Sequence, residues 1–147
     1  MQRLYRFFLL PSQKKILLVE SLFLVSAIRI SLWLLPFRRL NKWLSYLGSS
    51  DLDNNRIDWL ITKDAARAVR FCSRYVPFAS CLTQALALRT LLRLKGQNSQ
   101  LKIGVEKDID EKLAAHAWIE IDGKIVIGKM PRHQRYTVLN SSGSVII

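Results

Sequence analysis

The chain is poor in the residues that build disulfide frameworks, zinc sites and phosphate-binding loops. Its 147 residues include two cysteines, Cys72 and Cys81, and two histidines. Two cysteines are too few for a disulfide framework, and neither a CxxC nor an HExxH spacing is present. The six glycines are scattered singly, which excludes a glycine-rich phosphate loop. We therefore expect reduced thiols in a cytoplasmic protein that uses neither a metal nor another cofactor.

Acidic residues are also scarce. The chain has 11 of them against 23 lysines and arginines, which gives a formal charge of +12. A balance this basic favours anionic partners such as nucleic acid, a lipid surface or an acidic peptide, and charge alone does not choose among them. A stripe for nucleic acid could comprise Arg67, Arg70, Arg74, Arg89, Arg93 and Lys95. A solvated helix face is the simpler explanation, so we expect no specific nucleic-acid binding.

The most hydrophobic stretch runs from residue 16 to 36 and has the length of a membrane span. Glu20 and Arg29 interrupt it, and charges inside a span are costly. The stretch is followed by Arg38 and Arg39 instead of a small-residue cleavage site, unlike a secretory signal. We expect a buried or interfacial helix and no transmembrane span, with contact to a membrane surface left open.

Hydrophobic periodicity places helices first and an antiparallel sheet second, which is an α+β arrangement. Helices are expected between Pro11 and Pro36, over 56–75, and from Ser80 to Gly96. Strands are expected at 101–105, 117–121, 124–127, 136–139 and 144–147, with Asp122-Gly123 as a hairpin turn. The loop at 48–55 divides the chain into a hydrophobic helical subdomain, residues 1–50, and a core, residues 56–147.

Cys81 and His116 are the candidate catalytic residues. Ser80 is a good N-cap, so Cys81 falls in the first helical turn, where the macrodipole favours a thiolate and unpaired N–H groups can hold an oxyanion. His116 opens a strand and can take the thiol proton. Cys72 lies on an apolar helix face and is expected to be a core thiol, while His133 falls in a charged loop. A buried cysteine and a structural histidine are the alternatives for each residue alone; together they indicate a cysteine hydrolase.

Several segments resemble the transglutaminase-like cysteine protease superfamily, and more narrowly the stand-alone leader peptidases of lasso peptide biosynthesis. They are CLTQALAL at 81–88, LLRLKG at 91–96, IGV at 103–105, AHAWIE at 115–120 and YTVL at 136–139. The similarity extends to the amino-terminal helices and to LPFRRL at 35–40. It implies a transglutaminase-like or papain-like core, with a helix-borne cysteine packed on an antiparallel sheet and an N-terminal helical extension.

The resemblance also implies a reaction and partners. The chain would be a cysteine endopeptidase in the maturation of a ribosomally made peptide, removing the leader from a lasso precursor through a thioester, with Cys81 as nucleophile and His116 as general base and then acid. A separate leader-binding recognition element would present the precursor, and a lasso cyclase would close the ring. The cyclase of such systems uses ATP, for which this chain shows no site.

The third catalytic residue is left open. Superfamily members commonly carry an aspartate on the strand after the histidine strand, and a two-residue turn would set Gly128 opposite Ala117, next to that position. Glycine has no side chain to orient an imidazole. Asp122 lies in the turn, and six extended residues span about 20 Å, so it would point away. Asp108, Asp110, a backbone carbonyl or an amide side chain stay as alternatives.

Two other functions are compatible with the same sequence. The first is a non-enzymatic basic module that docks on nucleic acid or on a membrane surface. The second is acyl transfer or transglutamination, which would use Cys81 and His116 with a different acceptor. Loss of the Cys81 side chain separates an enzyme from a binding module, because only the enzyme would be inactivated.

Overall fold

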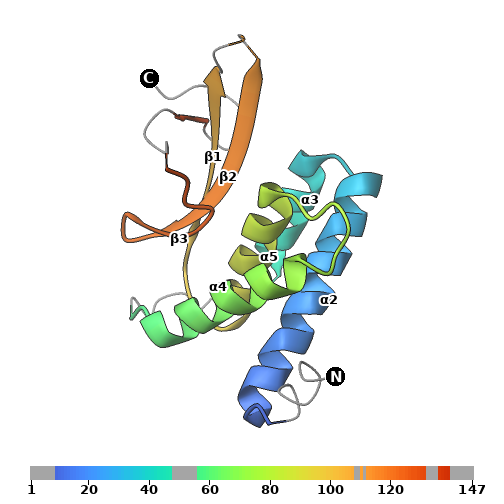
Figure 1. Cartoon of the computed structure of the whole chain (residues 1–147), viewed down its shortest axis with the longest axis vertical. Helices are drawn as coiled ribbons and strands as arrows, with labels where there is room; N and C mark the ends of the chain where they lie inside the picture. The colour runs from blue at the N-terminus through green and yellow to red at the C-terminus, as the bar shows by residue number, and fades with distance from the viewer. Residues whose placement is uncertain (1–8, 48–55, 108–109, 111, 132–135, 140–147) are drawn as a thin grey trace.

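The computed structural model describes residues 9–47, 56–107, 110, 112–131 and 136–139. Four helices and a four-stranded antiparallel sheet form the described part of the chain, and Figure 1 shows the helices gathered on one side of the sheet. The helices are α2 (Ser12–Leu34), α3 (Phe37–Tyr46), α4 (Trp59–Ser73) and α5 (Cys81–Leu94). The strands are β1 (Gln100–Lys107), β2 (Leu113–Ile121), β3 (Lys124–Ile127) and β4 (Thr137–Leu139). The predicted α+β class is confirmed, and the strand predicted at 144–147 lies outside the described residues.

Helix α2 begins after Pro11 and ends before Pro36, as the two prolines predict. One of its faces, centred on Val25 and Ile28, is buried against α4 and α5. Glu20, one of the two charges that interrupt its apolar sequence, pairs with Lys95 beyond the end of α5 at 2.7 Å. By length and composition alone α2 is also sufficient to span a membrane.

The packing of α2 leads to a prediction about cell fractionation. Since one face of the helix is buried against α4 and α5, we expect it to stay with the rest of the protein and not to cross a bilayer. Any protein found in a membrane fraction should therefore be released by high salt or carbonate. If neither salt nor carbonate released the protein and only detergent did, the prediction would be wrong, because a helix inserted in hydrocarbon resists washing with salt or carbonate.

Helices α4 and α5 supply much of the core. Asp58 caps α4 by accepting hydrogen bonds from the N–H groups of Leu60 and Ile61. Cys72 is 4% exposed, and its Sγ donates to the carbonyl of Leu18 at 3.4 Å. Burial raises the pKa of the Cys72 thiol, which keeps it protonated. Cys72 is therefore the core thiol that its helix face predicts.

The strands are arranged in the order β3-β2-β1-β4. Asp122 and Gly123 both have positive φ, as a two-residue hairpin turn requires, and Ile121 pairs with Lys124. One expectation about this hairpin is wrong. A regular ladder would set Gly128 opposite Ala117, but a bulge adds Val126 to β3, so that Ile119 pairs with Ile127 and the register beyond it shifts by one residue.

The two faces of β2 have different neighbours. Ala117, Ile119 and Ile121 belong to the buried cluster that includes the α5 leucines. Because side chains alternate along a strand, His116 and Trp118 lie on the opposite face. The subdomain division at 1–50 and 56–147 stays a prediction, although α2, α4 and α5 share one core.

Candidate active site

Cys81 is the first residue of α5 and is half-buried. Ser80 is the N-cap and forms a capping box with Thr83: the Thr83 N–H donates to Ser80 Oγ at 3.3 Å, and the Ser80 N–H donates to Thr83 Oγ1 at 3.3 Å. This leaves the N–H groups of Cys81 and Leu82 at the helix end, where a helix offers them no internal acceptor. The thiol thus lies beside a donor pair suited to a developing oxyanion.

The cap supports a stability prediction. Ser80→Ala removes the acceptor of the Thr83 N–H and should lower the free energy of unfolding by about 1 kcal/mol. Ser45→Ala is the matched control, because Ser45 Oγ donates to the Lys42 carbonyl within α3 and caps no helix start. Urea denaturation of both variants measures the difference. Equal stability losses would show that the cap does not hold the first turn of α5.

His116 lies on β2 and is held through its Nε2 atom. Nε2 is 2.6 Å from the carbonyl oxygen of Gly128. A carbonyl oxygen only accepts hydrogen bonds, so Nε2 carries the proton in this contact. In the neutral imidazole the other nitrogen, Nδ1, is then an unprotonated acceptor. This is the tautomer that a general base needs if Nδ1 is the atom that takes the thiol proton.

Gly128 approaches β2 so closely that only glycine fits. Its φ is +86°, and a Cβ at this position would lie 2.8 Å from the Ala117 oxygen and 2.8 Å from Trp118 Cβ. Gly128, next to the position where an aspartate is expected, therefore contacts His116 through its main chain. Among the alternatives for the third catalytic residue, the structure supports a backbone carbonyl. Asp122 lies in the turn before β3, Asp110 is exposed between β1 and β2, and Asp108 lies outside the described residues.

Two aromatic rings surround the imidazole. Trp118 stacks on His116 with ring centroids 6.0 Å apart, and Tyr136 contacts it at 5.6 Å. Trp118 is 2% exposed, and its Nε1–H donates to Glu120 at 2.7 Å. Gly104, which pairs with His116 across the sheet, makes room for them: a Cβ there would lie 2.9 Å from the Trp118 ring and from Tyr136 Cβ. Trp118 and Tyr136 thus form an aromatic wall beside His116, and Trp118 is also a core residue.

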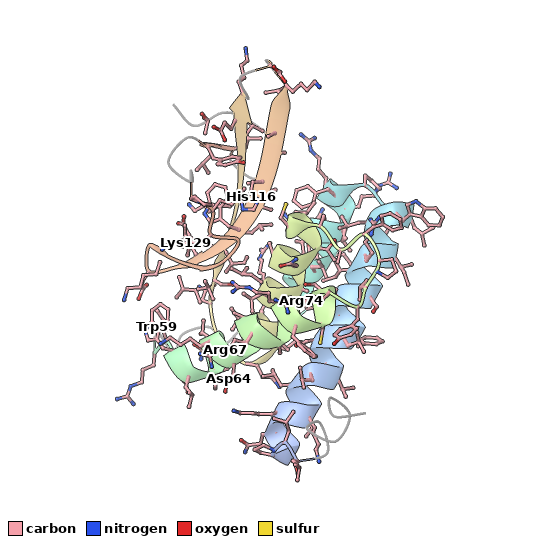
Figure 2. All side chains as sticks on the ribbon, in the orientation of Figure 1. Trp59, Asp64, Arg67, Arg74, His116 and Lys129 are labelled. Atoms are coloured by element: carbon pink, nitrogen blue, oxygen red, sulfur yellow. The ribbon has the colours of Figure 1, made fainter. Side chains whose placement is uncertain are left out.

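The elements that carry Cys81 and His116 are neighbours. Helix α5 packs on β2, and Figures 1 and 2 place His116 at the level of the first turn of α5. His116 lies on the face of β2 opposite Ala117, and a hydrogen bond between Cys81 and His116 is not among the contacts of the described residues. Catalytic hydrogen bonds are often long before substrate binds. The reaction between the two side chains stays a prediction.

The basic stripe proposed for nucleic acid is not continuous. Arg89 Nη1 donates to Asn41 of α3 at 2.6 Å, and burial lowers the pKa of Arg89, which the charge of Arg93 lowers further. Lys95 is engaged with Glu20. Arg89 and Lys95 are therefore engaged in contacts between helices, that of Arg89 partly buried and that of Lys95 at the surface. In the described residues, no group of three or more histidine, cysteine or acidic side chains could hold a metal ion.

Comparison with known protein families matches residues 24–141 to the transglutaminase-like superfamily. The matched region begins within α2, includes both Cys81 and His116, and extends past β4. Neither the curated proteins nor the solved structures contain a match to this chain. The superfamily includes cysteine proteases and transferases, in agreement with a helix-borne cysteine and a strand-borne histidine. The match covers most of the sequence, and the chain therefore belongs to the transglutaminase-like superfamily.

Proposed function

We propose that this protein is a cysteine endopeptidase that removes the leader from a ribosomally made lasso peptide precursor. The observation that carries the proposal is the placement of Cys81 at the capped start of α5, a helix that packs on β2, the strand whose His116 is held by the Gly128 carbonyl. The membership of the superfamily supports cysteine chemistry in general. The narrower assignment to leader removal rests on the motifs at 81–88 and 115–120.

The proposed reaction has two halves. In the first, Cys81 Sγ attacks the scissile carbonyl carbon while His116 Nδ1 takes the thiol proton, and the N–H groups of Cys81 and Leu82 hold the oxyanion. The amide bond breaks, the imidazolium gives its proton to the departing amine of the core peptide, and the leader stays on Cys81 as a thioester. In the second, His116 takes a proton from water and the hydroxide attacks the thioester. The C–S bond then breaks, His116 returns the proton to the Cys81 thiolate, and the leader leaves with a carboxyl group that ionises.

The Gly128 carbonyl has a defined part in this scheme. It accepts the Nε2–H bond in the neutral imidazole, so Nδ1 is the nitrogen without a proton and would be the one to take the proton of the thiol. When His116 becomes cationic, the same bond becomes charge-assisted and strengthens. A carbonyl carries a partial charge where an aspartate would carry a full one, so it supplies orientation more than electrostatic stabilisation. The Trp118 and Tyr136 rings lie against the imidazole that makes this bond.

The partners are part of the same proposal. A separate recognition element would bind the leader and present the precursor, and a lasso cyclase would use the freed amine. All three proteins would meet in the cytoplasm, where Cys81 stays reduced. The proposal includes no specific nucleic-acid partner and no transmembrane span.

The test is mass spectrometry of a lasso precursor incubated with this chain, with and without a recognition element. We expect cleavage at one bond, giving an intact leader with a free carboxylate. An aminated leader formed only when a primary amine is added would indicate a transferase instead. No cleavage of any candidate precursor under either condition would refute the peptidase.

A further inference from the structure

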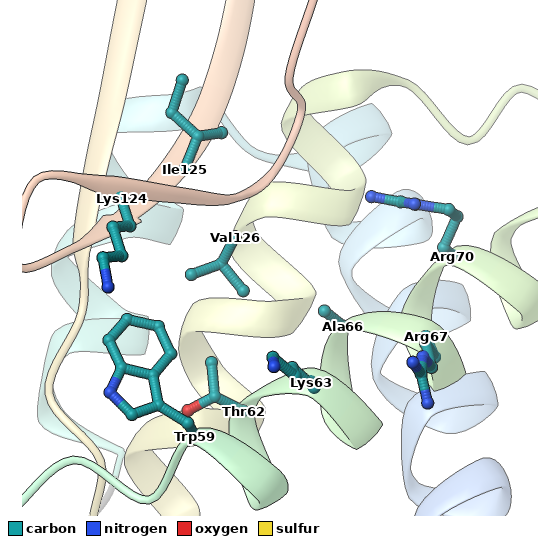
Figure 3. A pocket seen from close by; sticks show the side chains of 9 residues that line it. All are labelled: Trp59, Thr62, Lys63, Ala66, Arg67, Arg70, Lys124, Ile125 and Val126. Carbon is teal, nitrogen blue, oxygen red and sulfur yellow. The ribbon is translucent and has the colours of Figure 1, made fainter.

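A groove of about 490 Å³ lies between α4 and β3 (Figure 3), and neither His116 nor Gly128 is among the residues that line it. The α4 side carries Trp59, Lys63, Arg67 and Arg70, and the β3 side carries Lys124. Figure 3 shows Lys124 of the strand reaching toward Trp59 of the helix, with Lys63, Arg67 and Arg70 following along α4. Neither the proposed reaction nor the superfamily match assigns a role to this groove.

The groove concentrates positive charge without matching acids. Lys63, Arg67 and Arg70 follow one another on an exposed stripe of α4 at helical spacing, and like charges so placed repel each other. Asp64 is the acid that pairs with them among the described residues, through a long contact of 3.8 Å to Arg67. Folding gains little from such a cluster, so its charge is available for an anionic ligand.

The walls of the groove favour an extended peptide. β3 is at the edge of the sheet, and in the described part of the chain only β2 pairs with it. Its outer edge therefore offers main-chain donors and acceptors to an added strand. Val126 and Ala66 provide apolar surface between the cations. The Lys124 ammonium lies 5.1 Å over the Trp59 ring and covers the face on which a nucleic-acid base would stack.

We propose that this groove binds an acidic segment of a peptide, which lies along β3 with its carboxylates on Lys63, Arg70 and Lys124. The proposal rests on the proposed function in one respect, since the natural occupant would be the leader of the peptidase substrate. β3 leads directly to Gly128, about four residues or ~13 Å beyond Lys124 at strand spacing. A peptide bound along this edge is thus directed toward the residue that holds His116.

The experiment measures peptide binding apart from cleavage. The full chain carrying Cys81→Ala is titrated into a fluorescein-labelled peptide in which glutamate alternates with valine, and into the same peptide with glutamine. We expect the glutamate peptide to bind at least tenfold tighter, with affinity falling as salt rises. The double variant Lys63→Glu, Arg70→Glu should lose this preference. Lys42→Glu with Lys107→Glu, which changes charge equally at exposed sites on α3 and β1, should change affinity less than twofold.

Each result has a defined meaning. If both double variants lost affinity for the glutamate peptide equally, net charge alone would attract the peptide, and the proposed binding groove would be wrong. If a single-stranded oligonucleotide displaced the peptide, and its affinity also fell when Lys63 and Arg70 were replaced, the groove would be a nucleic-acid site and not a peptide site. Lys124→Glu, on β3, repeats the test if the α4 double variant does not fold. Selective binding of the glutamate peptide with no cleavage of any precursor would support the binding groove and refute the peptidase. Precursor cleavage that the α4 double variant leaves unchanged would support the peptidase and refute the binding groove.

Discussion

Replacing Cys81 by alanine is expected to abolish precursor cleavage while leaving the stability of the protein nearly unchanged. Cys81 is half-buried at a helix start, so the loss of one sulfur removes the nucleophile but little packing. The expected decrease in rate is at least about ten-thousandfold, because no other described side chain replaces a thiolate. Cleavage assays and thermal unfolding of the same preparation measure the two effects together.

Cys72→Ala is the matched control for that result. Cys72 is 4% exposed and donates to the Leu18 carbonyl, so its replacement leaves a small cavity and removes a weak hydrogen bond between α4 and α2. We expect a loss of about 1 kcal/mol in the free energy of unfolding with activity retained. A folded but inactive Cys72→Ala protein, together with an active Cys81→Ala protein, would reverse the assignment of the two thiols.

Gly128→Ala is expected to give the second largest effect, a decrease of about a hundredfold in kcat/KM. The added methyl group would lie 2.8 Å from the Ala117 oxygen and from Trp118 Cβ, so the main chain must move and take its carbonyl away from His116. Nitrogen chemical shifts of the His116 ring report the cause directly. In the wild-type protein Nε2 should carry the proton, and the variant should populate both neutral tautomers.

Gly96→Ala separates this effect from simple backbone strain. Gly96 also has a positive φ, +74°, but a Cβ at that position meets nothing within 4 Å. Both variants should lose about 1 kcal/mol of stability from the left-handed backbone, Gly128→Ala should lose more because its methyl group also displaces the main chain, and only Gly128→Ala should lose activity. If the two variants had equal activity, the Gly128 carbonyl would not be a positioning group for His116.

Local signals predicted the elements of this fold well. Pro11 and Pro36 mark the ends of α2, Ser80 marks the start of α5, and Asp122-Gly123 marks the hairpin. Each signal acts within a few residues, through a fixed φ, a capping hydroxyl or a positive φ, so it needs no knowledge of the rest of the chain. The same is true of Cys81 at the helix start.

Features that depend on tertiary packing were not predictable. The bulge at Val126 lies where β3 pairs with β2 and also contacts α4, and it moved the register around Gly128. The sequence shows that Gly128 stands next to the position where the superfamily commonly has an aspartate. It does not show that the Gly128 carbonyl points at His116. Lys124 also gave no signal in the sequence, because its role in the groove comes from the contact of β3 with α4.

The most direct test of the central claim is the intact mass of the protein during turnover. The full chain is mixed with precursor and recognition element and quenched in acid within the first turnovers. A peptidase acting through Cys81 should carry an added mass equal to the leader minus one water, mapped to Cys81 and released by hydroxylamine. The adduct should be missing from Cys81→Ala. Rapid precursor cleavage with no adduct, or with an adduct mapped to another residue, would contradict the account.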